Sequence, residues 1–373
     1  MKLKPFELER YFSKYEFSAK HLLSCSDCEP YEMSSLLQSA DSQALRLWNN
    51  LSLSYTPSQG IPMLLDEISG MYQNIMPSDI LQVIPEEGIY IAMRTLVSEG
   101  DEVIVMHPCY QSLEEVALSQ GANVLHWNAV YDNTWRFSID ALDEMCSQST
   151  HMIVINTPHN PTGCSFTKTE FAEIINIAKK NNCILFCDEM YRFLEFDSKN
   201  RLPSACEVYE GAVVLCGLSK SFAMPGLRLG WLIAKNRSFF NEFKNYKDYT
   251  TICASAPSQV LGIMALRKKE KILNRNLDII NKNLASLDTF AAKYKGLISY
   301  SKPKGGSICM PVLDKSIGAD ALAQKLIDEK NLMILPASVY NIQANAFRLG
   351  FGRKDFTASL DILDSFLEQY LIK

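Results

Sequence analysis

The sequence predicts an α/β protein in which a mostly parallel sheet carries helices on its faces, together with a second, smaller α/β domain. Two observations predict the sheet. Short apolar runs alternate with helix-like segments through the middle of the chain, and these runs are continuous rather than interrupted by polar residues. A strand that is buried on both faces has this pattern. The third observation is that both ends of the chain lack this alternation, and 373 residues are enough for two domains.

Four central strands are expected at the apolar runs, which occupy residues 103–106, 152–155, 184–187 and 213–216. Between the second and third runs, Thr167 and Glu170 have the spacing of a capping box, in which two side chains satisfy free N–H groups at the start of a helix. Apolar residues then recur at helical spacing over residues 171–178. A second helix is expected over residues 89–97, ending at Gly100.

The predicted domain division follows from where this pattern changes. Residues 1–45 are mostly helical and polar in pattern, whereas the C-terminal part mixes helices with short strands such as residues 332–335. We therefore expect a large domain at residues 46–284, and a discontinuous small domain made of residues 1–45 and 285–373.

Composition and charge exclude several classes of protein. A formal net charge of −5 offers no basic footprint for nucleic acid. No apolar run approaches the roughly 20 residues that span a bilayer. The N-terminal residues also lack the apolar stretch of a signal peptide. A cytoplasmic protein with no nucleic-acid or membrane partner is expected.

The 11 cysteines are expected to be reduced. Cys183, Cys187 and Cys216 lie in or beside apolar runs, as small core residues do. Cys25 and Cys28 form a C-x-x-C pair, but a structural zinc site needs a second pair, and no other cysteines have suitable spacing. No metal is expected.

Polar residues gather just beyond the end of each apolar run, in the segments 107–110, 156–163, 188–191 and 217–220. Ligands of open α/β sheets bind beyond the carboxyl ends of the strands, so these segments are expected to meet in one site. Burial of Lys220 at a strand end would lower the pKa of its amine and make it nucleophilic. A solvated loop lysine is the alternative interpretation of Lys220.

These segments resemble the signature of class I and II aminotransferases, the fold-type-I enzymes that use pyridoxal 5′-phosphate (PLP). The matching residues are Asn160-Pro161-Thr162-Gly163, Asp188 with Tyr191, and Ser219-Lys220 followed by Arg228. The resemblance extends from Tyr55 to Arg353. It implies the three-layer PLP-transferase fold of aspartate aminotransferase, PLP as the cofactor, and a homodimer with shared active sites.

The resemblance also assigns catalytic roles. Lys220 would form the Schiff base with PLP, and Asp188 would keep the pyridine nitrogen protonated so that the ring withdraws electrons. Asn160 and Tyr191 match the pair that bonds the phenolic oxygen of the cofactor. On residue type alone, Asp188 also suits a helix N-cap, and Asn160 suits a turn before proline.

The cofactor phosphate is expected near Arg228, because a guanidinium suits a phosphate. A surface ion pair is the alternative for this arginine. Glu86 and Glu87 lie in the turn that binds the phosphate in the family through N–H groups at a helix start. Gly217 departs from the family, which commonly has Ser or Thr there to contact the phosphate. Ser219 is the candidate replacement.

Three further positions match the family. Tyr110 corresponds to the aromatic residue that stacks on the cofactor ring, with plain core packing as the alternative. Tyr55 corresponds to the tyrosine that reaches the phosphate from the neighbouring subunit. Arg348 corresponds to the arginine that binds the substrate α-carboxylate, and we prefer it to Arg353 because it lies in the strand-like part of its segment.

An acidic loop at residues 25–29 lies where the family covers its substrate. It suggests a substrate with a basic or hydroxyl-bearing side chain, although a solvated acidic loop explains the same residues equally well.

The resemblance implies transamination between an amino acid and a 2-oxo acid, with Asn160 and Arg348 contacting the substrate. Elimination, replacement or cyclisation is the alternative, because these reactions use the same cofactor-binding residues. A non-catalytic PLP sensor is a more remote alternative, since no basic helix-turn-helix segment precedes Tyr55. The sequence lacks the G-x-x-x-x-G-K-[ST], H-E-x-x-H and G-x-S-x-G motifs of other enzyme classes.

Overall fold

The computed structural model describes residues 2–371, and a seven-stranded sheet forms its centre. The strand order is β2-β10-β9-β8-β7-β3-β4, with bounds β2 (Ile80–Val83), β3 (Glu102–His107), β4 (Asn123–Asn128), β7 (Thr150–Asn156), β8 (Ile184–Asp188), β9 (Ala212–Gly217) and β10 (Gly230–Ala234). β10 runs antiparallel to both of its neighbours, β2 and β9, and the other pairs of this sheet are parallel. The mostly parallel sheet is confirmed, and the four predicted strands lie within β3, β7, β8 and β9.

Alternate residues of the central strands face two separate cores. In β8, Leu185 and Cys187 pack into one core, while Ile184 and Phe186 pack into the other. Both faces of the strand are therefore apolar, which is why its sequence is a continuous apolar run. Helices α8 (Lys168–Lys180) and α11 (Ala256–Arg267) contribute to the first core. Helices α5 (Pro85–Leu96), α6 (Ser112–Ser119) and α10 (Arg237–Lys247) contribute to the second, which completes three layers.

Side-chain hydrogen bonds explain where two of the helices begin. At the start of α8, the Thr167 hydroxyl accepts the N–H of Glu170 at 3.2 Å, and the Glu170 carboxylate accepts the N–H of Thr167 at 2.7 Å. The predicted capping box is confirmed. Helix α5 begins at Pro85, four residues before the predicted start, because proline suits the first helical turn and Glu87 accepts the N–H of Ile84 at 3.1 Å.

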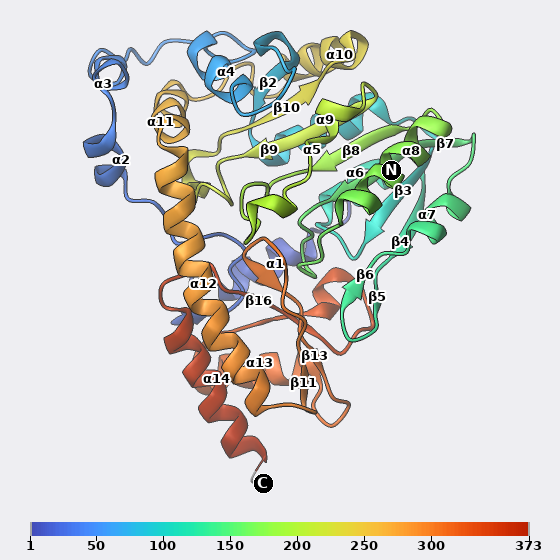
Figure 1. Ribbon diagram of the computed structural model, residues 1–373, viewed down its shortest axis with the longest axis vertical. Coiled ribbons are helices and arrows are strands. Elements are labelled where there is room, and N and C mark those ends of the chain that lie inside the picture. The colour runs from blue at the N-terminus through green and yellow to red at the C-terminus, as the bar shows by residue number, and fades with distance from the viewer. Residues whose placement is uncertain (1, 372–373) are drawn as a thin grey trace.

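A third core lies away from the sheet and joins both ends of the chain. It contains Leu23 together with residues of α12 (Lys269–Lys293), α13 (Ala319–Lys330) and α14 (Phe356–Leu371). Figure 1 shows α12 and α14 side by side below the sheet. The N-terminal part reaches this region through α1 (Glu7–Tyr15) and through β1 (His21–Leu22), which pairs in parallel with β14 (Leu332–Met333).

Helices α2 (Met33–Ser39) and α3 (Ser42–Asn49) pack elsewhere. Their residues Leu36 and Ala44 belong to the core that contains α11, on the sheet-bearing part of the molecule. Leu8 of α1 belongs to a further small core with Trp135 and Tyr340, so the N-terminal segment that the sequence assigns to the small domain is divided among three cores.

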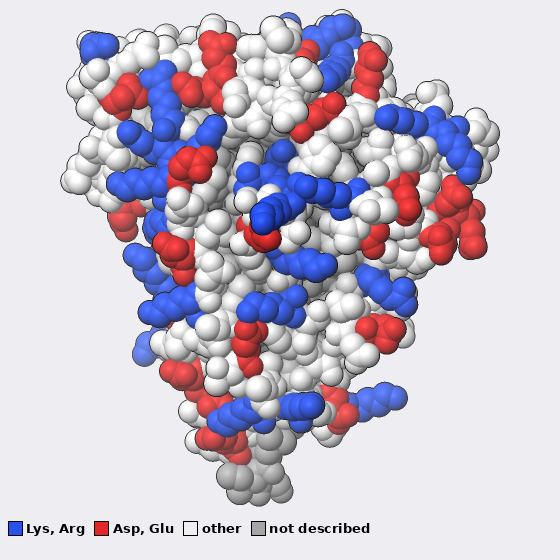
Figure 2. Space-filling view, viewed as in Figure 1, with Lys and Arg blue, Asp and Glu red and all other residues white. Residues whose placement is uncertain are grey.

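The remaining elements are short or peripheral. They include α4 (Pro62–Ser69), α7 (Ile139–Met145), α9 (Ala205–Val208), β5 (Val130–Tyr131), β6 (Trp135–Arg136), β11 (Ile298–Ser299), β12 (Ile308–Cys309), β13 (Val312–Leu313), β15 (Leu335–Pro336) and β16 (Phe347–Gly350). Among residues 2–371, no helix combines the length and apolarity needed to cross a membrane. Acidic and basic side chains are intermingled over the face shown in Figure 2.

Candidate active site

A cavity of about 490 Å³ lies at the carboxyl ends of the central strands. It brings together most of the predicted site residues: Lys220, Asp188, Tyr191, Asn160, Arg228, Tyr110, Glu86, Ser219 and Arg348. Two predicted residues do not line it. Tyr55 is 87% exposed, and the carboxylate of Glu87 accepts the hydroxyls of Thr250 and Thr251 at 2.5 and 2.7 Å. Of the two acidic residues at the start of α5, only Glu86 reaches the cavity.

The strand ends are joined by Asn156, a residue to which the sequence analysis assigned no role. Asn156 and Asp188 are register partners at the ends of β7 and β8. The Asn156 amide donates to the Asp188 carbonyl at 3.0 Å, and its oxygen accepts the N–H of Asn160 at 2.6 Å. Asn156 thereby fastens the loop that carries Asn160 to the edge of the sheet.

Asp188 is a buried acid with little compensation. Its side chain accepts one backbone N–H, from Met190 at 3.0 Å. Burial raises the pKa of this carboxyl to about 7. A carboxylate in such surroundings is stabilised by a cation placed against it, and a protonated ring nitrogen can supply that charge.

Lys220 follows β9 and extends into the same cavity. Its amine donates to the Ser26 hydroxyl at 2.8 Å, across 194 residues of sequence. Burial lowers the pKa of this amine, while the acidic groups of Asp27 and Asp188 act in the opposite direction. An amine with a lowered pKa is more often neutral at a given pH, and the neutral form attacks an aldehyde.

The departure from the family at Gly217 has a steric cause. A Cβ atom at this position would lie 2.9 Å from Cα of Gly230 and 3.0 Å from the carbonyl oxygen of Leu229. The antiparallel partner strand β10 approaches too closely for a serine or threonine. Ser219, two residues later, is buried with a hydroxyl that lacks a hydrogen-bond partner within residues 2–371. It lines the cavity and is free to bind a ligand oxygen there.

Arg348 is 1% exposed and is held by three acceptors. One terminal nitrogen donates to the Asn160 oxygen at 3.1 Å and the Tyr340 hydroxyl at 2.6 Å, and the other donates to the Ser24 carbonyl at 2.6 Å. Its Nε has no partner in the part of the chain that the structure describes. Arg353 instead forms a two-pronged ion pair with Asp27, with N–O distances of 3.0 Å. Of these two arginines, Arg348 is therefore the one with an N–H group that no described residue accepts.

Tyr191 and Tyr340 complete this side of the cavity. The Tyr191 hydroxyl donates to the Ser26 carbonyl at 2.9 Å, and burial raises the pKa of this phenol. Tyr340 ends a short helical turn, η4 (Ala337–Tyr340), and bonds both Arg348 and Asn160. It carried no signal in the sequence, because its partners are close only in the folded chain.

The opposite side of the cavity holds Arg228, Tyr110 and Glu86. Arg228 has a left-handed backbone (φ 51°) after the turn η3 (Pro225–Leu227), and it is exposed. The Tyr110 hydroxyl lies 3.4 Å from the Glu9 carboxylate. Burial raises the pKa of Glu86. This side borders the N-terminus of α5, where backbone N–H groups favour an anion.

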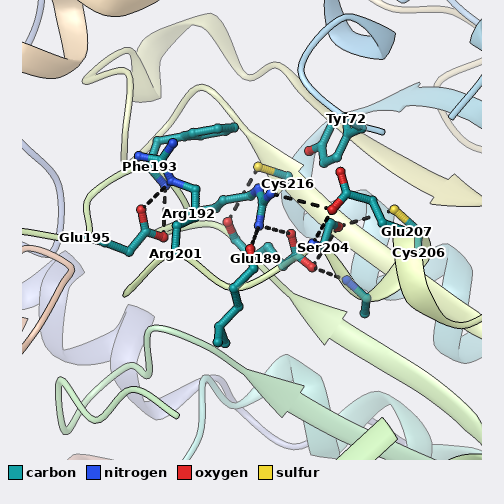
Figure 3. Close-up of polar contacts among 12 residues, drawn as sticks. Tyr72, Glu189, Arg192, Phe193, Glu195, Arg201, Ser204, Cys206, Glu207 and Cys216 are labelled. Carbon is teal, nitrogen blue, oxygen red and sulfur yellow. Dashed lines mark hydrogen bonds and ion pairs between the residues drawn. The ribbon is translucent and has the colours of Figure 1, made fainter. Parts of the chain in front are cut away.

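Figure 3 shows a network of polar contacts around Glu189 and Arg192. The Glu189 carboxylate accepts the Ser204 hydroxyl at 2.8 Å and lies 3.7 Å from the Arg192 guanidinium. Arg192 also donates to the Leu202 carbonyl at 2.7 Å. Glu189 and Arg192 directly follow Asp188 and Tyr191 in the sequence, so their contacts help to hold the turn that carries these two residues. In the sequence, the signal for this network was an acid and a base three residues apart, Glu189 and Arg192.

Comparison with known proteins supports this arrangement. The family model of class I and II aminotransferases matches residues 37–357. A PLP-dependent aminotransferase of Streptococcus suis is 28% identical, with a TM-score of 0.92 over 99% of each chain. A probable aspartate aminotransferase of Methanocaldococcus jannaschii is 26% identical over 84% of this chain and 85% of its own.

Two proteins that are not named as aminotransferases are similar as well. Capreomycidine synthase of Streptomyces vinaceus is 26% identical over 71% of this chain and 67% of its own length. The structure of the PLP-dependent cyclase OrfR superposes with a TM-score of 0.90 at 23% identity, which shows a shared fold.

The sequence resemblance and the fold agree along most of the chain, and the family model covers the segments that form the cavity. The predicted family, fold class and enzyme class are confirmed: the chain is an enzyme of the class I and II aminotransferase family, the PLP-dependent enzymes whose fold it shares.

Proposed function

We propose that this protein is a PLP-dependent aminotransferase that moves an amino group between an amino acid and a 2-oxo acid. The observation that carries the proposal is the shared cavity of Lys220 and Asp188, in which burial lowers the pKa of the amine and raises that of the carboxyl. A nucleophilic amine and an acid that lacks a cation are the two groups that PLP requires.

The residues around the cavity fit this cofactor. Lys220 would hold its aldehyde carbon and Asp188 its ring nitrogen, with Tyr110 against the ring. Asn160 and Tyr191 would face the phenolic oxygen. The phosphate would lie by Arg228, the unpartnered Ser219 hydroxyl and the start of α5, where Glu86 lines the cavity.

The chain's own groups then have defined tasks. PLP, when bound, withdraws electrons from the substrate Cα and so makes its proton acidic. The freed Nζ of Lys220 takes that proton, acting as a general base. Arg348 orients the substrate by its α-carboxylate, with Asn160 and Tyr340 holding the guanidinium in place.

The test is a half-reaction with the purified holoenzyme. A correct amino acid, added without an oxo acid, should remove the visible absorption of the cofactor stoichiometrically, and a 2-oxo acid should restore it. Storage of nitrogen in this way distinguishes transamination from elimination or cyclisation. The fold shared with the PLP-dependent cyclase OrfR keeps cyclisation as the second candidate. Release of ammonia or a cyclic product, with no stored nitrogen, would establish that second candidate instead.

Arg348→Ala should weaken the binding of amino and oxo acids while PLP stays covalently bound. Loss of a buried charged contact costs on the order of 2–5 kcal/mol. Spectral titration of the holoenzyme gives the dissociation constants. Arg348→Lys is the matched control, because it keeps the charge and loses the planar donors. Its dissociation constants should lie between those of the wild type and those of Arg348→Ala. Unchanged binding in the alanine variant would exclude Arg348 as the carboxylate site.

We also propose a homodimer whose active sites are shared. Apolar side chains of Leu53, Tyr55, Tyr249 and Ile252 are exposed by 85, 87, 91 and 52%. Their two segments lie together, since the Thr56 hydroxyl donates to the Ala254 carbonyl at 3.3 Å. An exposed apolar patch of this kind favours burial against a second copy.

Tyr55→Phe should weaken retention of PLP, because in a dimer its hydroxyl would reach the partner's phosphate. Mixing Lys220→Ala chains with Tyr55→Ala chains should restore part of the activity, since hybrid dimers contain one intact site. Each variant alone is the control, and sedimentation measures the dimer. A monomer with full PLP occupancy would contradict the shared site.

Two further proposals concern domains and location. We propose that the small domain takes its N-terminal part from the chain before α2, since α2 and α3 pack with α11. We propose a cytoplasmic enzyme with reduced thiols. The cysteines within residues 2–371 are free, and Cys25 and Cys28 are both buried.

A further inference from the structure

We propose that the amino acid substrate carries a positively charged side chain, which the carboxylates of Glu16 and Glu9 recognise. This inference rests on the proposed function in one respect: the substrate amino group lies toward Lys220 and its α-carboxylate at Arg348. It deepens that function by naming the substrate class.

The cavity holds more acidic groups than its cations can neutralise. Its lining includes five carboxyl groups, on Glu9, Glu16, Asp27, Glu86 and Asp188, and four basic groups, on Lys220, Arg228, Arg348 and Arg353. Charges that line one cavity interact with one another and with any ligand in it, so the unpaired ones influence which ligand it accepts.

Most of these charges already have partners or assigned tasks. Asp27 is paired with Arg353 inside the protein. Asp188 faces the cofactor nitrogen in the proposed function, and Arg228 faces the phosphate. Glu86 lies on the phosphate side, where burial raises the pKa of its carboxyl and so favours its neutral form. Arg348 is reserved for the substrate α-carboxylate. Glu9 and Glu16 then remain as the carboxylates of the lining that form no ion pair within residues 2–371.

These two carboxylates lie on one face of the N-terminal helix region. Glu9, Phe12 and Glu16 are spaced by three and four residues, which aligns them along one side of a helix. All three line the cavity, and the Phe12 ring lies 5.7 Å from the Arg348 guanidinium. Glu9 and Glu16 therefore border the place where the substrate carboxylate would lie.

Glu16 is crowded by other acids. Burial raises the pKa of its carboxyl, and the neighbouring carboxylates of Asp27 and Glu9 raise it further, while the charges of Arg353 and Lys220 lower it by smaller amounts. Within residues 2–371 its side chain makes no hydrogen bond, and the Glu9 side chain has a single long contact with the Tyr110 hydroxyl. A cation that enters this place would relieve the repulsion among three carboxylates.

The buried Arg348 gives an independent indication that a ligand binds here. Its side chain lines the cavity and is 1% exposed, yet its Nε has no hydrogen-bond partner among residues 2–371. With the carboxylate at Arg348 and the amino group near Lys220, the cofactor would occupy the side of Asp188, Ser219 and Arg228. The substrate side chain is left with the walls formed by α1 and residues 25–27.

This arrangement selects against an acidic substrate. A second substrate carboxylate would need a free cation on the α1 side, and Arg353 is already bound to Asp27 at both oxygens. A neutral hydroxyl would leave Glu9 and Glu16 without a compensating charge. An ammonium or guanidinium group satisfies both their charge and their hydrogen-bonding capacity.

The experiment compares matched amino acids on the holoenzyme. Arginine is paired with citrulline, its neutral isostere, and lysine with norleucine, while aspartate and homoserine represent the acidic and hydroxyl classes. Dissociation constants come from spectral titration and, independently of any reaction, from calorimetry and ligand-induced thermal shift. At least one cationic amino acid should bind ten times or more tighter than its neutral partner and than aspartate or homoserine.

The variants identify the residues. Glu16→Gln should weaken binding of the cationic amino acid on the order of tenfold and leave its neutral partner nearly unchanged, and Glu9→Gln should have the same effect to a smaller extent. Glu7→Gln is the matched control, because Glu7 is an exposed acid of α1 that does not line the cavity. Its binding constants should equal those of the wild type.

Two results would overturn the inference: binding of aspartate, homoserine or the neutral isosteres as tight as that of the cationic amino acids, or unchanged cationic binding in both Glu9→Gln and Glu16→Gln. The proposed function fails differently. If a cationic amino acid binds selectively and is consumed without nitrogen storage, the substrate class stands and transamination falls. If aspartate stores its nitrogen on the cofactor, transamination stands and the substrate class falls.

Discussion

Replacing Lys220 with alanine should abolish covalent attachment of PLP and lower the turnover number by at least about 10³-fold. Two tasks are lost together, nucleophilic attachment and proton transfer at the substrate Cα, and proton transfer alone contributes roughly 10²–10⁴-fold. Borohydride reduction of the wild-type holoenzyme, followed by peptide mapping, should locate the cofactor on Lys220. The variant should yield no such adduct.

The controls for Lys220 separate charge from reactivity. Lys220→Arg keeps a cation in the cavity but supplies no nucleophilic amine, so it should behave like the alanine variant. Lys282→Ala removes an exposed lysine of α12 and should be indistinguishable from wild type. An adduct on another lysine, or turnover retained in Lys220→Ala, would refute the assignment on which the proposed function depends.

Asp188→Asn should have opposite effects on the apoprotein and on the holoenzyme. In the folded apoprotein the carboxyl has a pKa of about 7, raised by burial from an ordinary value of 3.8, so folding favours its protonated form. Its contribution to stability is therefore fully present below about pH 4 and is lost as the pH rises through about 7. The loss is on the order of 4 kcal/mol of unfolding free energy. Asparagine is neutral at low and at high pH, so the variant does not lose this stability as the pH rises.

The apo variant should therefore unfold at a higher temperature than apo wild type at pH 8, and at nearly the same temperature at pH 4. Addition of PLP should reverse the order at pH 8, because the wild-type carboxylate gains a protonated ring nitrogen as its partner and the variant does not. Melting curves and PLP titrations measure both effects. Asp278→Asn, which changes an exposed acid of α12, is the control and should change neither. Equal stability of the two apoproteins at both pH values would contradict the buried, uncompensated state of Asp188.

The central sheet was predictable because its signal is local. Each residue of β8 is buried, so the apolar run from Ile184 to Cys187 predicts the strand without reference to any neighbour. The capping box of Thr167 and Glu170 is equally local, because both partners lie within one helical turn. The polar residues after each run were predictable in position, since parallel strands deliver their carboxyl ends to one edge.

The partners of the site residues were not predictable in this way. Lys220 bonds Ser26 across 194 residues, and Arg348 bonds Asn160 across 188. No periodicity connects such positions. The same holds for Tyr340 and for α1, which complete the cavity from distant parts of the chain.

What the sequence by itself determined is therefore the sheet, the order of its strands along the chain, and the residues placed at their ends, because burial and capping act over a few residues. The tertiary structure decided which of those residues meet. It turned Glu87 toward Thr250 and Thr251, and it paired Arg353 with Asp27 while leaving Arg348 with a free donor. It also required glycine at position 217, because Gly230 of the antiparallel strand approaches there and the physical limit is van der Waals contact between two backbones.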